Sequence, residues 1–293
     1  MNASVKPVAA IVVNFRTPDL AILAVHAMFV GDSVPEEIVV VDNGSADGSA
    51  EAISAAFGDR AKVIMNAENR GFGGANNQGI AATKAPYVWL VNSDAEAGPR
   101  TLSDICSFMD AHPAVGAVSP TLVYPDGRPQ SPGGFFPGIW SVFLYFFPIH
   151  KALPGFLRQK MRLMAIVPGA LVPAAGMPLG YVTGAALFAR RDALVSAGGF
   201  DEDYFMYFEE TDLCRRMQAA GFGIAAIRTD PVVHAGGGSF RHRHDARRFD
   251  LFVSGLRRFV RKSYRGPYLS ALLLLIAACA PISVLMRRIF LPR

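Results

Sequence analysis

The sequence of residues 8–14 is VAAIVVN, six apolar side chains followed by one amide. A continuous apolar run of this kind is typical of a strand that is buried on both faces of a parallel sheet. A helix is predicted from Pro18, because proline favours the first helical position and Thr17 is a suitable N-cap. The chain therefore begins with a buried strand and a helix, the repeating unit of an α/β fold.

The same pattern continues along the first part of the chain. Further apolar strands are predicted at residues 38–41, 62–65 and 87–91, with helices over 49–57 and after the glycine-rich segment 69–79. Apolar strands that alternate with helices indicate a mostly parallel central sheet flanked by helices on both faces. In such sheets ligands bind beyond the carboxyl ends of the strands.

Composition separates the chain into two parts. Residues 1–240 hold 17 Lys and Arg against 22 Asp and Glu, whereas residues 241–293 hold 12 against 2. A basic tail binds either nucleic acid or an anionic membrane face. The uncharged run 268–286 lies inside this tail and favours the membrane, so we expect no nucleic-acid partner. We predict a catalytic domain over 1–240 and a basic, apolar, membrane-associating helical tail over 241–293.

Two apolar segments admit more than one arrangement. The run 268–286 has 19 residues and is interrupted by Pro281, so a spanning helix, a re-entrant hairpin and an interfacial helix all fit it. An aromatic insert at about 135–175 is too short and too broken by prolines to span a bilayer. It forms either a core helix of a subdomain or an interfacial loop.

The N-terminus and the cysteines bear on the compartment. The first residues lead straight into the first strand, without the pattern of a cleavable signal. Three cysteines lie far apart, in spacings that suit neither a metal site nor a disulfide framework: Cys106, Cys214 and Cys279. We therefore expect a cytosolic catalytic domain.

Polar side chains follow the second predicted strand and fill the loop after the third. Asp42 begins the sequence DNGS, in which a carboxylate at a strand end can accept hydrogen bonds from a ribose or a base; an ordinary turn is the alternative. Residues 69–79, NRGFGGANNQG, do not match the dinucleotide-binding fingerprint. Their glycines would allow close approach to a ligand, and Asn76 and Asn77 would bind a nucleotide or cap the helix.

Carboxylates and a histidine follow two other strands. Asp94 and Glu96 come directly after a buried strand, and His234 ends the strand-like run 230–234. Carboxylates at this spacing can approach one divalent cation that bridges a diphosphate, and His234 is a candidate third ligand. Surface-loop acidity and a structural histidine are the alternatives. The segment RHRH at 241–244 is a basic stretch suited to contacting phosphates.

Residues 200–216, FDEDYFMYFEETDLCRR, combine six carboxylates with five aromatic rings. Carboxylates beside apolar groups are costly unless they are paired, bind a cation or transfer protons. The segment is therefore either the acidic start of a helix, with its rings in the core, or part of an acid–base site.

Taken together, seven segments resemble the family 2 glycosyltransferases, and within them the bacterial rhamnosyltransferase-like branch. The resemblance covers about residues 8–240 and rests on residues 13–15, 41–45, 69–73, 92–94, 184–186, 205–213 and 233–234. It implies a GT-A fold, a nucleotide-sugar donor, Mg²⁺ or Mn²⁺, and inversion at the anomeric carbon.

The resemblance also assigns roles to single residues. Asp42 would bind the nucleoside, and Asp94, with His234 and less securely Glu96, would coordinate the metal on the diphosphate. Glu210 stands at the catalytic-base position, where the family usually has Asp, so Glu209 and Asp212 remain alternative bases. The remaining nucleotide-sugar contacts are expected from Asn14, Asn69, Gly71 and Asn76.

We therefore expect a metal-dependent inverting glycosyltransferase of cell-envelope glycan biosynthesis, at the cytoplasmic face of the inner membrane. It would be peripheral or held by a single C-terminal span. The expected donor is dTDP-L-rhamnose and the expected acceptor a polyprenyl-linked glycan or polysaccharide; a UDP-hexose donor is the alternative. A sugar nucleotidyltransferase is less favoured because its glycine-rich basic loop is absent from residues 14–18. A non-catalytic membrane scaffold would have no use for the carboxylates.

Overall fold

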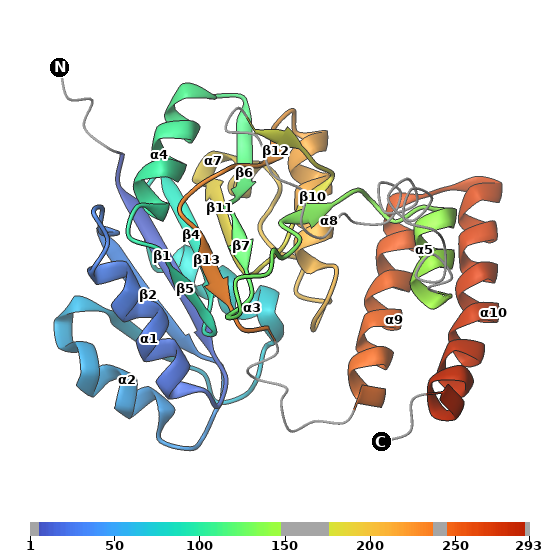
Figure 1. Ribbon diagram of the computed structural model, residues 1–293, viewed down its shortest axis with the longest axis horizontal. Coiled ribbons are helices and arrows are strands. Elements are labelled where there is room, and N and C mark those ends of the chain that lie inside the picture. The colour runs from blue at the N-terminus through green and yellow to red at the C-terminus, as the bar shows by residue number, and fades with distance from the viewer. Residues whose placement is uncertain (1–5, 148–175, 237–244, 291–293) are drawn as a thin grey trace.

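The computed structural model describes residues 6–147, 176–236 and 245–290. Its central sheet has the strand order β3-β2-β1-β4-β11-β6-β12-β9 (Figure 1). Strands β3, β2, β1 and β4 are parallel to one another, and β11 is antiparallel to both of its neighbours. The mostly parallel sheet is thus confirmed. In sheet order the strands are Lys62–Met65, Glu37–Asp42, Val8–Asn14, Tyr87–Asn92, Ala186–Arg190, Val115–Ser119, Gly223–Ala226 and Met177–Pro178.

Helices cover both faces of this sheet. Val8, Ala10 and Val12 of β1 pack into a core with α1, α2 and α4, whereas Ile11 faces a second core with α3, α7 and α8. This alternation follows from the two-residue repeat of a strand. The two helical layers are α1 (Pro18–Phe29), α2 (Ser49–Phe57) and α4 (Thr101–Ala111), and α3 (Gly71–Ala81), α7 (Arg191–Ser196) and α8 (Glu209–Ala219).

The strand order reverses at β1, because the chain passes from β1 through β2 to β3 on one side and returns with β4 on the other. A crevice forms at such a reversal, beyond the carboxyl ends of the strands. A small sheet of β5 (Ala95–Ala97), β13 (Val232–His234) and β7 (Leu122–Val123) adjoins β4, and β8 (Gly133–Gly134) pairs with β10 (Tyr181–Val182).

The glycine-rich segment differs from its prediction. It was expected to be a loop before a helix, but Gly71 already begins α3. A Cβ atom at Gly79 would lie 2.4 Å from Cγ2 of Ile11, and one at Gly73 would lie 3.0 Å from Cβ of Phe200. These glycines therefore allow α3 to approach the protein's own core rather than a ligand.

Thr17 is the N-cap of α1, as predicted, but its side chain makes no capping hydrogen bond. Its hydroxyl instead donates to Oδ1 of Asn14 at 3.1 Å and lies 3.1 Å from the hydroxyl of Ser93. This hydroxyl therefore links the ends of β1 and β4 rather than capping the helix.

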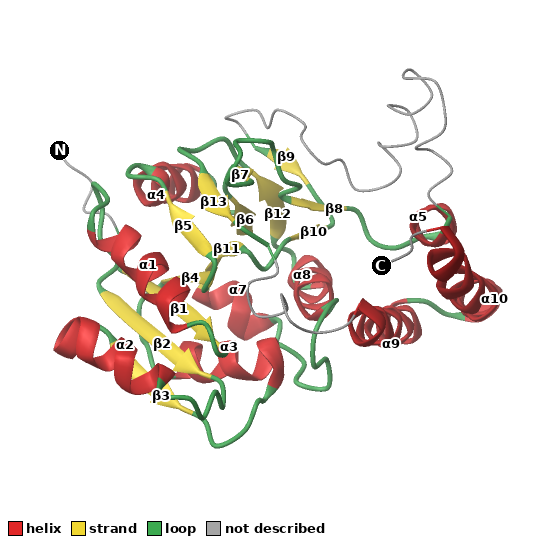
Figure 2. Ribbon diagram, turned by 60° about the horizontal axis from the view of Figure 1, so that its bottom comes forward, coloured by secondary structure: helices red, strands yellow, loops and turns green. Residues whose placement is uncertain are grey.

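The C-terminal helices form a third core on the side of α8 (Figures 1 and 2). Helices α5 (Ile139–Phe146), α9 (Asp245–Ser263) and α10 (Gly266–Phe290) bury their apolar faces against one another. This core also contains Tyr204 and Phe208 from the acidic, aromatic segment. The C-terminal helices are therefore packed against the predicted catalytic segment.

These helices answer part of the membrane prediction. Among the described helices, none has both the length and the apolar character needed to cross a membrane, so a C-terminal span has no support. Pro281 lies inside α10. The described part of the aromatic insert forms α5, which buries Val142 and Phe146 in the third core. The rest of the insert, residues 148–175, and the segment 241–244 lie outside the described residues.

Removing a ring from the third core should destabilise the protein strongly. The Phe259 side chain is fully buried, so Phe259→Ala is expected to lower the free energy of unfolding by about 3–5 kcal/mol. Leu274, on the adjoining helix, is 71% exposed, and Leu274→Ala should change the free energy of unfolding by less than about 0.5 kcal/mol. Urea unfolding of both variants checks this difference, and equal losses would contradict the packing described here.

Candidate active site

A cavity of about 260 Å³ opens at the carboxyl ends of β1 and β4. Its walls come from three places: the loops after the strands, the acidic, aromatic segment with the start of α8, and the first turns of α9. The polar and charged lining residues are Asn43, Asn69, Asn92, Ser93, Asp94, Thr183, Tyr207, Glu209, Glu210, His234, Arg247 and Arg248.

Two residues that were predicted to bind the donor, Asn14 and Asp42, are buried beneath this cavity. Asn14 donates to Oδ1 of Asp42 at 2.7 Å, and the hydroxyl of Ser45 donates to the same oxygen at 2.5 Å. The other oxygen of Asp42 accepts the backbone N–H of Ser45 at 3.2 Å. Asp42 is only 2% exposed, and neither it nor Asn14 lines the cavity. These bonds fix the ends of β1 and β2, and through them the position of Asn43.

Asn43 lines the cavity, although it was not among the predicted site residues. Its amide nitrogen donates to the side-chain oxygen of Asn69 and to the carbonyl of Gly71, both at 3.1 Å. Asn69 and Gly71, which were predicted to contact the donor, also line the cavity. The Asn-Gly dipeptide after an apolar strand was the available signal, because Asn in such a turn often bonds to nearby backbone.

Gly71 has φ of +74°, and a Cβ there would lie 2.6 Å from the carbonyl oxygen of Phe205. Its position thus depends on close contact with the acidic, aromatic segment. Asn76, another predicted contact, is buried within α3 and donates to the carbonyl of Phe72 at 2.9 Å. It does not line the cavity.

Two of the three predicted metal ligands meet. Antiparallel pairing of β13 with β5 places His234 opposite Ala95, and Nε2 of His234 lies 3.3 Å from Oδ1 of Asp94. Glu96 lies opposite Val233, is exposed, and does not line the cavity. The small sheet therefore joins Asp94 and His234 and leaves Glu96 apart.

The other ring nitrogen of His234 indicates its tautomer. Gln130 donates its amide N–H to the carbonyl of His234, which directs its side-chain oxygen to Nδ1 at 2.9 Å. Nδ1 therefore carries the proton, and the lone pair of Nε2 accepts the side-chain amide of Asn92 at 3.3 Å, beside Oδ1 of Asp94. An imidazole lone pair beside a carboxylate oxygen suits a cation. In the described part of the chain, no group of three or more His, Cys, Asp or Glu side chains could hold a metal ion.

The start of α8 presents Glu209 and Glu210 to the cavity. The two residues before it, Tyr207 and Phe208, have φ of +69° and +72°. Each costs about 1–3 kcal/mol in this left-handed conformation, which persists only when the surroundings hold it. A Cβ at Gly255 of α9 would lie 2.5 Å from the carbonyl oxygen of Tyr207, so α9 packs directly on this turn.

Burial perturbs both carboxyls. It raises the pKa of Glu210 to about 7. Burial and the neighbouring Glu210 raise the pKa of Glu209 well above its usual range, and Oε2 of Glu209 has no hydrogen-bond partner among the described residues. A pair whose members disfavour each other's charge holds a proton near neutrality, as an acid–base site requires.

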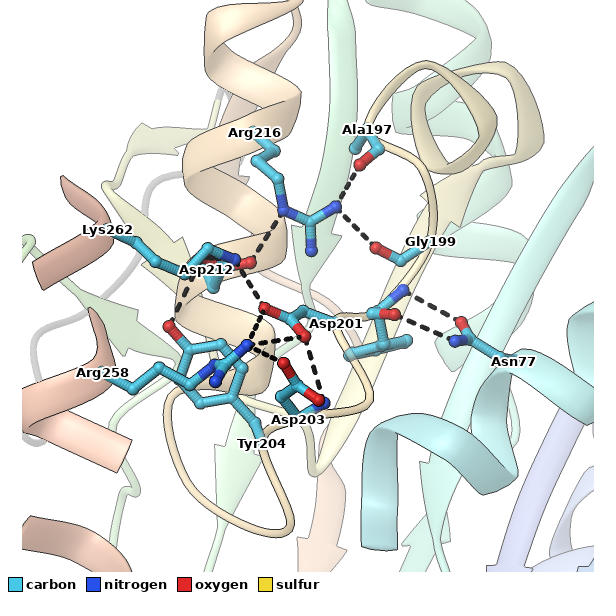
Figure 3. Close-up of polar contacts among 11 residues, drawn as sticks. Asn77, Ala197, Gly199, Asp201, Asp203, Tyr204, Asp212, Arg216, Arg258 and Lys262 are labelled. Atoms are coloured by element: carbon cyan, nitrogen blue, oxygen red, sulfur yellow. Dashed lines mark hydrogen bonds and ion pairs between the residues drawn. The ribbon is translucent and has the colours of Figure 1, made fainter. Parts of the chain in front are cut away.

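Asp212, the third candidate base, lies elsewhere. One of its oxygens pairs with Nε of Arg216 at 2.7 Å and the other with Nζ of Lys262 at 2.8 Å (Figure 3). It is 3% exposed and does not line the cavity. Since both oxygens are engaged by cations, Asp212 joins α8 to α9 and is poorly suited to accept a proton.

The same network holds the acidic segment. Lys262 pairs with Asp201 at 2.7 Å, and Arg258 pairs with both Asp201 and Asp203 (Figure 3). On the other side, Asn77 of α3 accepts the backbone N–H of Phe200 at 2.9 Å and donates to its carbonyl at 3.0 Å. Asn77 therefore fixes this segment, which is neither of the roles predicted for it.

Glu210→Gln should stabilise the fold at alkaline pH. The pKa of this carboxyl rises from 4.5 to about 7 on folding. Its contribution to the free energy of unfolding is therefore fully present below about pH 4.5 and is lost as the pH rises through about 7. The side chain is half-buried, so solvent reduces the effect to about 1–2 kcal/mol. Urea unfolding at about pH 8 and about pH 4 should show this gain only at the higher pH. A gain of equal size at both would contradict the shift.

The comparisons with known proteins agree with this geometry. The model of the family described as Glycosyl transferase family 2 matches residues 19–161. An N-acetylglucosaminyl-diphospho-decaprenol L-rhamnosyltransferase of Mycobacterium tuberculosis is 28% identical over 217 residues, which are 68% of this chain and 66% of that protein. The chain thus spans slightly less than two thirds of this relative's length.

Solved structures share the fold. A mannosyltransferase of Pyrobaculum calidifontis in complex with GDP-Man and Mn²⁺ has a TM-score of 0.61 at 18% identity, over 98% of this chain and 76% of that one. GalNAc-T7 with UDP, GalNAc and Mn²⁺ has a TM-score of 0.58 at 13% identity, over 89% and 48%. The expected GT-A-like α/β fold is confirmed, and residues 19–161 match the domain of glycosyltransferase family 2.

Proposed function

We propose that the protein is an inverting glycosyltransferase that moves a sugar from a nucleotide-sugar donor to a glycan acceptor, with Glu210 as the base. One observation carries this proposal: Glu209 and Glu210 line the same cavity as the Asp94–His234 pair. An acid–base carboxyl and a cation-binding pair in one cavity are the groups that this transfer needs.

The chemistry is a single displacement. The Glu210 carboxylate removes the proton of the acceptor hydroxyl as its oxygen attacks the anomeric carbon. The bond between that carbon and the diphosphate oxygen breaks, and the nucleoside diphosphate leaves with the bonding electrons. Attack opposite the leaving group inverts the anomeric centre. A pKa of about 7 leaves much of Glu210 ionised at neutral pH while keeping it basic enough to accept the proton.

The residues present fit a divalent cation. Asp94 and Nε2 of His234 would hold Mg²⁺ or Mn²⁺, with the donor diphosphate and water as the remaining ligands. The cation would neutralise charge that develops on the leaving diphosphate. Glu96 would have to move to join this set. Solved structures of the same fold that contain Mn²⁺ support metal dependence.

For the donor we propose dTDP-L-rhamnose, and a UDP-hexose as the second candidate. The mycobacterial relative, named as an L-rhamnosyltransferase, supports the first. Asn43, Asn69 and Gly71 would contact the donor directly, since they line the cavity. Asn14 and Asp42 would hold these residues in place from beneath the cavity. Asn76 would contribute only through its hydrogen bond within α3, without contacting the donor.

For the acceptor we propose a polyprenyl-linked glycan at the cytoplasmic face of the inner membrane, with the protein bound peripherally. The same relative is named for a diphospho-decaprenol substrate. Helices α5 and α10 expose large apolar side chains, with Trp140 at 66%, Leu274 at 71% and Ile282 at 48%. Such side chains, together with the basic residues of 241–293, suit an anionic membrane surface.

Removing the base or the cation-binding carboxylate should abolish transfer. Glu210→Gln is expected to lower kcat by about 10²–10⁴-fold, because an amide cannot accept the proton. Asp94→Ala should cause a loss of at least about 10²-fold, because the diphosphate charge is no longer neutralised through the bound cation. Radiolabelled or mass-spectrometric sugar transfer measures both.

The matched control is Glu202→Gln, an exposed carboxylate in the same segment that pairs with Arg70 at the surface. It should keep transfer within about threefold, as expected of an exposed ion pair. If Glu210→Gln and Asp94→Ala kept wild-type turnover, the assigned site would be wrong. Release of pyrophosphate from a nucleoside triphosphate and a sugar phosphate would indicate a nucleotidyltransferase instead.

A panel of nucleotide sugars tests the donor. Metal-dependent transfer or hydrolysis should be fastest with dTDP-L-rhamnose and slower with UDP-glucose, UDP-galactose and UDP-N-acetylglucosamine. Turnover of a UDP-sugar with dTDP-L-rhamnose inert would refute the rhamnose assignment and leave the reaction class intact.

A further inference from the structure

The cavity has a basic wall that the proposed chemistry does not use. Arg247 and Arg248, with Leu251, reach it from the first turns of α9, a helix outside the α/β sheet. Among the described residues that line the cavity, they are the only Lys or Arg side chains. From the sequence, the basic tail was predicted to associate with the membrane, and neither arginine was predicted to lie in the active site.

The position of this wall is fixed by the way α9 docks. Nε of Arg248 donates to the hydroxyl of Tyr207 at 3.3 Å, in the turn that leads into Glu209. Two turns further along α9, Gly255 packs on the carbonyl of Tyr207, and beyond it Arg258 and Lys262 pair with the acidic segment. The arginines are thus presented from a helix anchored at several points along its length.

Charge indicates what the arginines bind. Sugar hydroxyls are neutral and need few cations, whereas two adjacent guanidiniums match the oxygens of a diphosphate. The donor diphosphate is already assigned to the Asp94–His234 pair and its cation. The reaction brings in a second diphosphate only on a lipid-linked acceptor.

The surface next to the arginines suits the rest of such an acceptor. Phe252, one turn after Arg248, stacks on Tyr145 of α5 with ring centroids 4.0 Å apart. On the same short helix Trp140 is 66% exposed. An isoprenoid chain attached to a diphosphate at the arginines would find aromatic surface on α9 and on α5, and α5 is also proposed to meet the membrane through Trp140.

We propose that Arg247 and Arg248 form a binding site for the diphosphate of a lipid-linked acceptor, distinct from the site of the donor diphosphate. The inference rests on the proposed glycosyltransferase function and specifies its acceptor. It predicts that the enzyme distinguishes acceptors by the diphosphate as well as by the sugar.

The test uses two acceptors with the same sugar. In one the sugar is linked through a diphosphate to a prenyl chain, and in the other it is linked directly to a neutral alkyl chain of similar length. Both are presented in neutral detergent micelles, which removes any anionic lipid headgroup. The ratio of their kcat/KM values measures recognition of the diphosphate.

Wild type should prefer the diphosphate acceptor, and Arg247→Ala with Arg248→Ala should reduce that preference by about 10²-fold or more, since the charged hydrogen bonds to the diphosphate are lost. The loss should appear in KM for this acceptor, with KM for the donor unchanged. The control, Arg257→Ala with Arg261→Ala, removes the same charge from α9 outside the cavity and should leave the preference intact.

Three results would overturn the inference. The first is equal transfer by the wild type to both acceptors, and the second is a variant that keeps its preference. The third is a rise in KM for the donor, which would assign the arginines to the donor diphosphate. In each case transfer itself persists, so the proposed function would stand. Failure of the wild type to transfer to either acceptor with any nucleotide sugar would instead refute the proposed function.

Discussion

The structure depends on the left-handed turn at Tyr207 and Phe208. This turn starts α8 and directs Glu209 and Glu210 into the cavity, at a conformational cost of a few kcal/mol. Helix α3 supports the preceding segment through Asn77 and through the close approach of Gly71 to Phe205. Helix α9 supports the turn through Gly255. The proposed catalytic carboxyls are therefore positioned jointly by the α/β sheet and the C-terminal helices.

This arrangement changes the meaning of the basic tail. From the sequence, the charge and the apolar run of the tail predicted a membrane-associating segment attached to a separate catalytic domain. In the structure, α9 and α10 share a core with Tyr204 and Phe208, and α9 supplies ion pairs to Asp201 and Asp212. Some of the basic residues thus neutralise the acidic segment, and two others line the cavity. The opposite charges of the two regions meet in one interface.

Local patterns predicted much of the fold and the location of the site. The buried strands and helices of the first half were recognisable because apolar runs and helix signals depend on neighbours in sequence. Asp94 and His234 were expected to meet because both follow strands. Contacts between distant segments were less accessible: the glycines of α3 fit Ile11 and Phe200, and the pairing of Asp212 with Lys262 excludes it from the cavity. Neither has a signature in the local sequence.

The central claim is that the half-buried Glu210 takes the proton from the acceptor. The pH dependence of kcat/KM for sugar transfer tests it most directly, because this profile reports the ionisation of essential groups in the free enzyme. The account predicts that kcat/KM rises through an apparent pKa near 7, and that the residual activity of Glu210→Gln lacks this ionisation. A wild-type profile without it, or the same rise in Glu210→Gln, would contradict the assignment.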